Sequence, residues 1–153
     1  MRRIETSLII DRSPKEVWEC VANPLTWPMW ASSYLELKQT ASGPIAVGAT
    51  LQSKHPRSRE LAERVIELEP NHSFALEFTS GPIRGSRVSF RTEEATAPGS
   101  AARTRLTRLF DLKFSGLFRV FGPLLIAPGF RRESYAEVNK LKQLLEGTGI
   151  ARA

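Results

Sequence analysis

The two histidines of this chain lack the spacing of a metal site. His55 and His72 both lie near predicted turns, and neither has a cysteine or second histidine at the short spacing of zinc ligands. No run of carboxylates has the pattern of an iron or manganese site. We therefore expect no metal and no other cofactor.

Covalent catalysis is equally weakly indicated. Cys20 is the only cysteine, and it falls on the apolar side of a predicted helix, where cysteine usually packs as a small hydrophobic residue. The sequence has no Gly-x-Ser-x-Gly elbow, phosphate-binding loop or dinucleotide fingerprint. No catalytic residue is predicted. One cysteine cannot form an internal disulfide, which is typical of a reducing compartment, so a cytoplasmic location is expected.

One predicted strand carries a cation among apolar residues. Alternation places the following residues on one face: Thr104, Leu106, Arg108, Phe110 and Leu112. If this face is internal, Arg108 needs a partner, either a ligand carboxylate or an internal acid such as Glu63 or Glu77. The alternative is that the strand twists and Arg108 reaches solvent. We favour that alternative, because long basic side chains reach water easily.

Residues 114–130 form an unusually apolar segment that is too short and too interrupted to span a membrane. As core, it is a helix that packs on the sheet through Leu117, Phe121, Leu124 and Leu125. As a functional element, it is a mobile gate that touches a membrane transiently. We favour the core, because an apolar helix face normally packs inward. Pro128 and Gly129 predict an N-terminal helical piece, then a kink or loop, then regular helix from about Arg131.

The N-terminal elements are marked by local signals. Residues 3–11 predict a strand whose alternation places these residues on one face: Ile4, Thr6, Leu8 and Ile10. Ser13-Pro-Lys-Glu16 is a capping box that begins a helix. Its apolar face consists of Val17, Cys20 and Val21. Asn23-Pro24 ends this helix and predicts a second, very short one.

The middle of the chain reads as strands and turns, and the last part as a helix. Between residues 31 and 113, turn signals separate about six runs rich in β-branched and aromatic residues, which predicts an antiparallel meander. In one run, Val88 and Phe90 face inward and the arginines outward. The C-terminal helix is predicted from the spacing of Tyr135, Val138, Leu141 and Leu145, and Gly147 is its expected stop.

All three tryptophans lie between residues 13 and 30. A buried tryptophan removes more apolar area from water than an aliphatic side chain does. We therefore expect Trp18 and Trp27 to be structural, fastening the short helices to the sheet. Trp30 lies where the chain enters the second strand, and packing and ligand contact are equally favoured for it.

Composition indicates one ordinary globular domain. The chain has 153 residues, of which 41% are hydrophobic and 25% charged, and a formal net charge of +6. A basic balance can attract nucleic acid, but the arginines are scattered singly, so no nucleic-acid partner is expected.

Element order and two motifs together resemble a known superfamily. The motifs are residues 10–18, IDRSPKEVW, and residues 23–30, NPLTWPMW, with VIELEP at 65–70 and LKQLLE at 141–146 as further matches. The chain resembles the helix-grip superfamily: START lipid-transfer domains, the birch-pollen allergen group and, most closely, bacterial polyketide cyclase/dehydratase-like proteins. The resemblance implies an α+β fold in which about seven antiparallel strands curve around a long C-terminal helix. It covers residues 1–153 as a single domain, with 147–153 as a flexible tail.

The resemblance also implies a cavity between sheet and helix. Our leading hypothesis is that it binds a small hydrophobic molecule such as a lipid, quinone or polyketide, with transport of that molecule as an extension of binding. A cyclase, aromatase or dehydratase is the alternative, and a protein- or RNA-interaction factor is a further one; the oligomeric state stays open. The expected ligand-binding residues are Trp30, Phe90, Leu106, Arg108, Phe110, Phe121, Leu124 and Leu125.

Overall fold

The computed structural model describes residues 2–56, 59–114, 119–120 and 127–147. The strands and helices follow the predicted order: β1 (Arg2–Ile10), α1 (Pro14–Val21), the 3-10 helix η1 (Pro24–Met29), β2 (Glu36–Gln39), β3 (Thr50–His55), β4 (Arg59–Glu69), β5 (Ser73–Phe78), β6 (Arg87–Glu94), β7 (Thr104–Leu112) and α3 (Ala127–Glu146).

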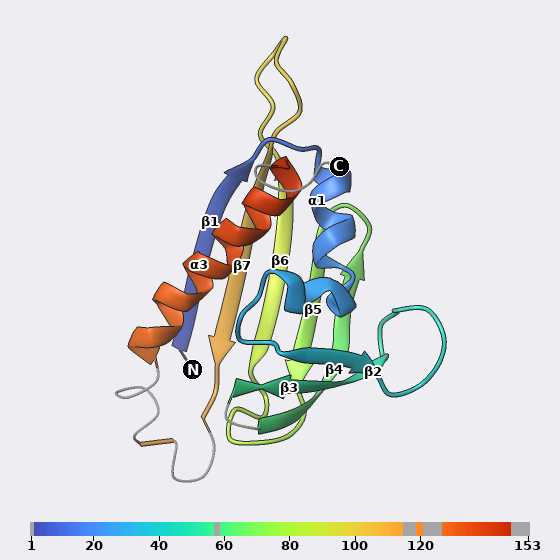
Figure 1. The fold of residues 1–153 in the computed structure, drawn as a ribbon, viewed down its shortest axis with the longest axis vertical. Helices are drawn as coiled ribbons and strands as arrows, with labels where there is room; N and C mark the ends of the chain where they lie inside the picture. The colour runs from blue at the N-terminus through green and yellow to red at the C-terminus, as the bar shows by residue number, and fades with distance from the viewer. Residues whose placement is uncertain (1, 57–58, 115–118, 121–126, 148–153) are drawn as a thin grey trace.

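The strands form one antiparallel sheet with the order β1-β7-β6-β5-β4-β3-β2. It is a meander from β2 to β7 in which β1 adds beside the last strand. In Figure 1, α3 lies along β1 and β7, and β2 and β3 run at a steep angle to them, which shows how strongly the sheet curves. Helix α1 packs on β5, β6 and β7. The predicted helix-grip fold is thus confirmed.

Strand alternation correctly predicted which side chains of β1, β6 and β7 face the interior of the protein. In β1, Ile4, Thr6 and Ile10 are buried. In β7, all five residues predicted to share a face are buried, Arg108 among them. In β6, Val88 and Phe90 are buried while Arg87 and Arg91 are exposed. These strands stay in unbroken register, so the period of two holds along their length.

The capping box begins α1 as predicted. The Ser13 hydroxyl accepts a hydrogen bond from the backbone N–H of Glu16 at 3.3 Å, and Pro14 stands at the first helical position. Val17 and Val21 are buried against the sheet. Trp18 then ties α1 to β5, because its indole Nε1 donates to the Ser73 carbonyl at 2.8 Å.

The other two tryptophans fill the interior beneath η1. Trp27 and Trp30 are both buried, and their ring centroids lie 6.0 Å apart. Trp27 also packs edge-on against Phe74 and Phe90, at 6.1 and 5.4 Å, and its Nε1 donates to the Val21 carbonyl at 3.0 Å. The expected structural role of Trp27 is confirmed, and this part of the interior is packed with side chains.

Helix α3 begins earlier than predicted. It runs from Ala127, so Pro128 and Gly129 lie in its first turn, and the regular helix starts four residues before the expected Arg131. Proline is tolerated in a first turn because the N–H that it lacks has no partner there. The end is as predicted, since Gly147 follows the helix with φ of +74° and closes it in the left-handed region.

The buried face of α3 is partly polar. Val138 and Leu141 are buried as predicted, but Tyr135 is 54% exposed, so its place on the inner face is wrong. Ser134 and Glu137 are buried instead. They share a face with Leu141 at helical spacing, and the sheet supplies their polar partners. Ser134, for example, lies with its hydroxyl 3.0 Å from that of Thr6 in β1.

Two predictions fall outside the described residues. One is the inward face of the apolar segment, made by Leu117, Phe121, Leu124 and Leu125. The other is the flexible tail, of which residues 148–153 are not described.

Candidate ligand-binding cavity

A cavity of about 410 Å³ lies between the first turns of α3 and the far ends of β3, β5 and β7. Its walls come from elements that are distant in sequence. Most of the wall is apolar, with a few polar groups among it. The lining residues are Ser33, Tyr34, His55, Pro56, Arg59, Leu61, Phe78, Pro82, Ile83, Phe110, Phe130 and Glu133.

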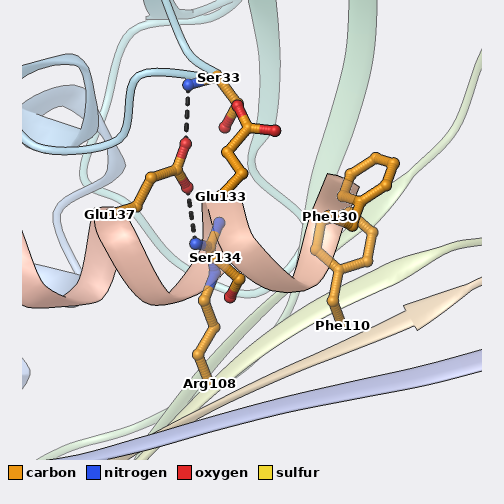
Figure 2. A pocket seen from close by; sticks show the side chains of 7 residues that line it. All are labelled: Ser33, Arg108, Phe110, Phe130, Glu133, Ser134 and Glu137. Atoms are coloured by element: carbon orange, nitrogen blue, oxygen red, sulfur yellow. Dashed lines mark hydrogen bonds and ion pairs between the residues drawn. The ribbon is translucent and has the colours of Figure 1, made fainter. Parts of the chain in front are cut away.

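Five rings form a continuous aromatic wall in this cavity. Their centroids follow one another at 4.7 Å from Tyr34 to His55, 6.3 Å from His55 to Phe78, and 6.1 Å from Phe78 to Phe110. Phe130 of α3 adds the last contact, 5.3 Å from Phe110. Figure 2 shows the rings of Phe110 and Phe130 close together at one side of the site. Such a wall offers flat apolar area to a planar ligand.

An ion pair buried between sheet and helix lies beside this wall. Arg108 Nη1 of β7 is 2.7 Å from Glu137 Oε1 of α3, and both side chains are 2% exposed. The other carboxylate oxygen accepts a hydrogen bond from the backbone N–H of Ser33 at 2.7 Å (Figure 2). The Arg108 guanidinium also lies over the Phe90 ring, 5.5 Å from its centroid. Glu137 thus joins α3, β7 and the loop before β2.

Both expectations for Arg108 need correction. Its side chain does not reach solvent, because β7 stays regular and α3 covers it. Its internal partner is neither of the acids considered. Glu77 pairs with Arg64 at 3.4 Å on the outer face, and Glu63 bonds to Tyr34. The carboxylate that the buried cation requires comes from α3.

A second, much smaller void adjoins the large cavity. It measures about 20 Å³ and is lined by Ser33, Arg108, Phe110, Phe130, Glu133, Ser134 and Glu137. Four of these residues also line the large cavity, and the three that do not are all buried. The void therefore lies at the inner wall. Burial, followed by the charge of Glu137, raises the pKa of Glu133, and Arg108 opposes this.

Another buried acid, Glu63, stands behind the aromatic wall. The Tyr34 hydroxyl donates to Glu63 Oε1 at 2.6 Å, while Glu63 Oε2 has no hydrogen-bond partner among the described residues. Burial raises the pKa of Glu63 to about 7, although the bond from Tyr34 favours the ionised form. Burial, and then the charge of Glu63, raise the pKa of Tyr34 well above its ordinary value.

His55 is held in place at both ring nitrogens. Nδ1 lies 2.7 Å from the Ser33 carbonyl oxygen, so it carries the proton and donates. Nε2 lies 2.8 Å from the Ser53 hydroxyl, whose single proton it shares with the Leu61 carbonyl oxygen at 3.2 Å. Burial lowers the pKa of His55, and the bond to Ser33 only partly offsets this. The ring is therefore a neutral part of the wall with neither nitrogen free for a ligand.

In the described part of the chain, no three histidine, cysteine, aspartate or glutamate side chains are grouped to hold a metal ion. No helix among the described residues is long and apolar enough to cross a membrane. The ionisable groups at or beside the cavities include Arg108, Glu133, Glu137 and Glu63.

Residues 1–146 match the model of a family described as polyketide cyclase / dehydrase and lipid transport. The chain belongs to this family. The match spans nearly the whole chain and confirms the resemblance to polyketide cyclase/dehydratase-like proteins. Among curated proteins, none matched the chain.

Solved structures share the fold of this family member at low sequence identity. The Zhui aromatase/cyclase from a Streptomyces strain is 18% identical, with a TM-score of 0.73 over 98% of this chain and 96% of that one. The di-domain aromatase/cyclase BexL is 19% identical, with a TM-score of 0.72 over 99% of this chain and 48% of that one. The protein XoxI from Bacillus cereus is 14% identical, with a TM-score of 0.73 over 99% and 100%. These likenesses show the fold.

The predicted ligand-binding residues of this polyketide cyclase-family chain fall into three groups. Phe110 lines both cavities, and Arg108 lines the small one. Trp30, Phe90 and Leu106 are buried in the packed core and line neither of these two cavities. Phe121, Leu124 and Leu125 lie outside the described residues. Ligand contact stays a prediction for all eight.

Sequence reasoning considered Glu63 only as a possible partner of Arg108 and His55 only as a metal ligand, and it predicted neither as part of the site, although signals for both existed. Glu63 lies between Leu61 and Val65 on one face of β4, so alternation places it inside. His55 follows Leu51 and Ser53 on one face of β3 in the same way. In both strands the alternation predicts an inward side chain, but the polar or charged type of the residue was given more weight.

Proposed function

We propose that this protein binds a small hydrophobic molecule with a planar, aromatic body, such as a quinone or a cyclised polyketide. The carrying observation is the cavity of about 410 Å³ with its wall of five rings. Its size lies within the usual range of about 300–1,000 Å³ for small-molecule sites, and apolar walls with few polar groups are typical of such sites. Family membership supports the same class of ligand.

Filling the cavity should weaken ligand binding. Ile83 is half-buried on the loop between β5 and β6 and lines the cavity, so tryptophan there projects into the space without replacing a core side chain. We expect Ile83→Trp to weaken binding of acetylnaphthalene, measured by fluorescence titration, at least tenfold. Val47→Trp is the control, because Val47 is exposed and lines neither cavity. Equal affinity of Ile83→Trp and wild type would place the ligand elsewhere.

An enzyme is the second candidate, favoured by Glu63. An acid with a pKa of about 7, bonded to a tyrosine that lines the cavity, has the properties of a proton donor near neutral pH. In a dehydration, the hydroxyl group of a β-hydroxy ketone takes a proton from Tyr34 and leaves as water, while protonated Glu63 passes its own proton to Tyr34, so that no tyrosinate forms. The α-proton of the ketone passes to solvent, and Glu63 regains its proton from solvent.

This second candidate predicts a specific loss. With a phenyl-substituted β-hydroxy ketone as probe, enone formation is followed by ultraviolet absorbance. Tyr34→Phe is expected to lower turnover by about 10²–10⁴-fold with little change in ketone affinity, because only the proton donor is removed. Wild-type turnover should fall above pH 7 as Glu63 ionises. Turnover that is absent in the wild type, or unchanged in Tyr34→Phe, would reject the enzyme.

The location and mode of action are proposed from the sequence. We infer that the protein holds or carries its ligand in the cytoplasm, which the single cysteine, Cys20, supports. Transient membrane contact through residues 114–130 is part of the same proposal.

A further inference from the structure

The small void beside the cavity is large enough for one water molecule or one ligand oxygen atom. A buried water needs about 10–15 Å³ or more of such space and polar partners around it. This void measures about 20 Å³ and is lined by Arg108, Glu133, Ser134 and Glu137 among others. It therefore has the size and the polarity of a site for a single polar group.

Arg108, which lines this void, has an unused hydrogen-bond donor. The Arg108 side chain is 2% exposed, and Glu137 satisfies its Nη1, but its Nε has no hydrogen-bond partner among the described residues. A buried N–H without an acceptor is unfavourable by about 1–3 kcal/mol. The acceptor that Arg108 lacks would come from whatever enters the void.

The charges around the void select the kind of acceptor. Glu137 already balances the positive charge of Arg108, and Glu133 adds a second carboxyl group on the same side of the site (Figure 2). A ligand carboxylate or phosphate would bring another negative charge beside two acids and would need space for further oxygens. A neutral carbonyl oxygen has neither disadvantage.

We propose that this void is a subsite for one neutral carbonyl oxygen of the ligand, bound by Arg108 Nε, while the aromatic body of the ligand occupies the large cavity. The inference rests on the proposed binding function, and it narrows the ligand to a hydrophobic ketone, aldehyde or quinone. It also excludes the ligand carboxylate that the sequence left open as a partner of Arg108. In the absence of ligand, a water molecule serves as the acceptor.

Three matched probes test the subsite without changing the protein. Acetylnaphthalene carries the carbonyl, isopropenylnaphthalene has the same shape without an acceptor, and naphthoate carries a negative charge. We expect the wild type to bind the ketone about tenfold more tightly than the alkene, the gain from one hydrogen bond to a charged donor. Naphthoate should bind more weakly than the ketone. Fluorescence titration or calorimetry measures all three.

A conservative variant tests the donor. Arg108→Lys keeps a cation beside Glu137 but has a methylene group in place of Nε–H. We expect the tenfold preference for the ketone to fall to about one while alkene binding is retained. Arg103→Lys is the control, because Arg103 pairs with Asp11 at an exposed site and lines neither cavity. Its preference for the ketone should match that of the wild type.

The outcomes separate this inference from the proposed function. Equal binding of ketone and alkene by the wild type overturns the subsite, since the void then holds water only, and leaves the hydrophobic cavity in place. Tighter binding of naphthoate overturns the subsite in favour of an anion site. A preference for the ketone that persists in Arg108→Lys would mean that a group other than Arg108 Nε donates the hydrogen bond, and this also overturns the subsite. Failure of all three probes to bind overturns both proposals.

Discussion

Glu137→Ala is expected to lower the free energy of unfolding by about 3–5 kcal/mol, because it leaves the Arg108 guanidinium buried without its counter-charge. The two side chains are 2% exposed and 2.7 Å apart, so the guanidinium stays buried and has at most a water molecule of the adjoining void in place of the lost charge. The backbone N–H of Ser33 also loses its acceptor. Urea denaturation of the variant and the wild type measures the difference.

Removing both charges should restore much of the lost free energy of unfolding. In the double variant Arg108→Met, Glu137→Met, this site no longer contains a buried charge. The remaining loss of stability comes mainly from the unpaired N–H of Ser33 and is about 1–3 kcal/mol. Arg103→Ala is the comparison at an exposed ion pair, where a much smaller loss is expected because solvent screens the two charges. If Glu137→Ala costs no more than Arg103→Ala, the pair does not hold α3 on the sheet.

Glu63→Gln is expected to make the protein more stable above pH 7, and not at pH 4.5. The pKa of Glu63 is about 7 in the folded protein and 4.5 as its ordinary value, so between these values the folded state binds more protons than the unfolded state. Stability therefore falls as the pH rises through this window. At 1.36 kcal/mol per pKa unit, the loss reaches about 3 kcal/mol above pH 7.

Glutamine removes this loss because it stays neutral and its amide oxygen still accepts the Tyr34 hydroxyl. The stability difference between Glu63→Gln and wild type should grow from about zero at pH 4.5 to about 3 kcal/mol at pH 8, by denaturation at each pH. Glu60→Gln, at an exposed position of the same strand, is the control. A difference that is constant with pH would show that Glu63 titrates alike in both states.

An acid that destabilises the fold at neutral pH suggests a role beyond folding. A neutral glutamine would keep the hydrogen bond to Tyr34, so packing alone does not require glutamate at this position. Perturbed acids of this kind are concentrated at functional sites. The stability of Glu63→Gln and the turnover of Tyr34→Phe therefore both test the pair formed by Tyr34 and Glu63, one through folding and the other through catalysis.

Local signals in the sequence determined the elements of this protein. The capping box at Ser13, the alternation in β1, β6 and β7, and the stop at Gly147 each depend on neighbours within a few residues. Backbone geometry turns such short-range patterns directly into helix ends and strand faces. Two motifs near the N-terminus were then enough to indicate the helix-grip fold, which the family match and the structure confirm.

Only the tertiary structure decided how the site is assembled. Alternation placed Arg108 inward, but which helix residue stands opposite depends on the rotation and start of α3, and these placed Glu137 there. The large cavity likewise forms where β3, β5, β7 and α3 meet, which are far apart in the chain. A period of two or of 3.6 says which side of an element is buried. It does not say what lies across the interior, because that depends on how separate elements pack.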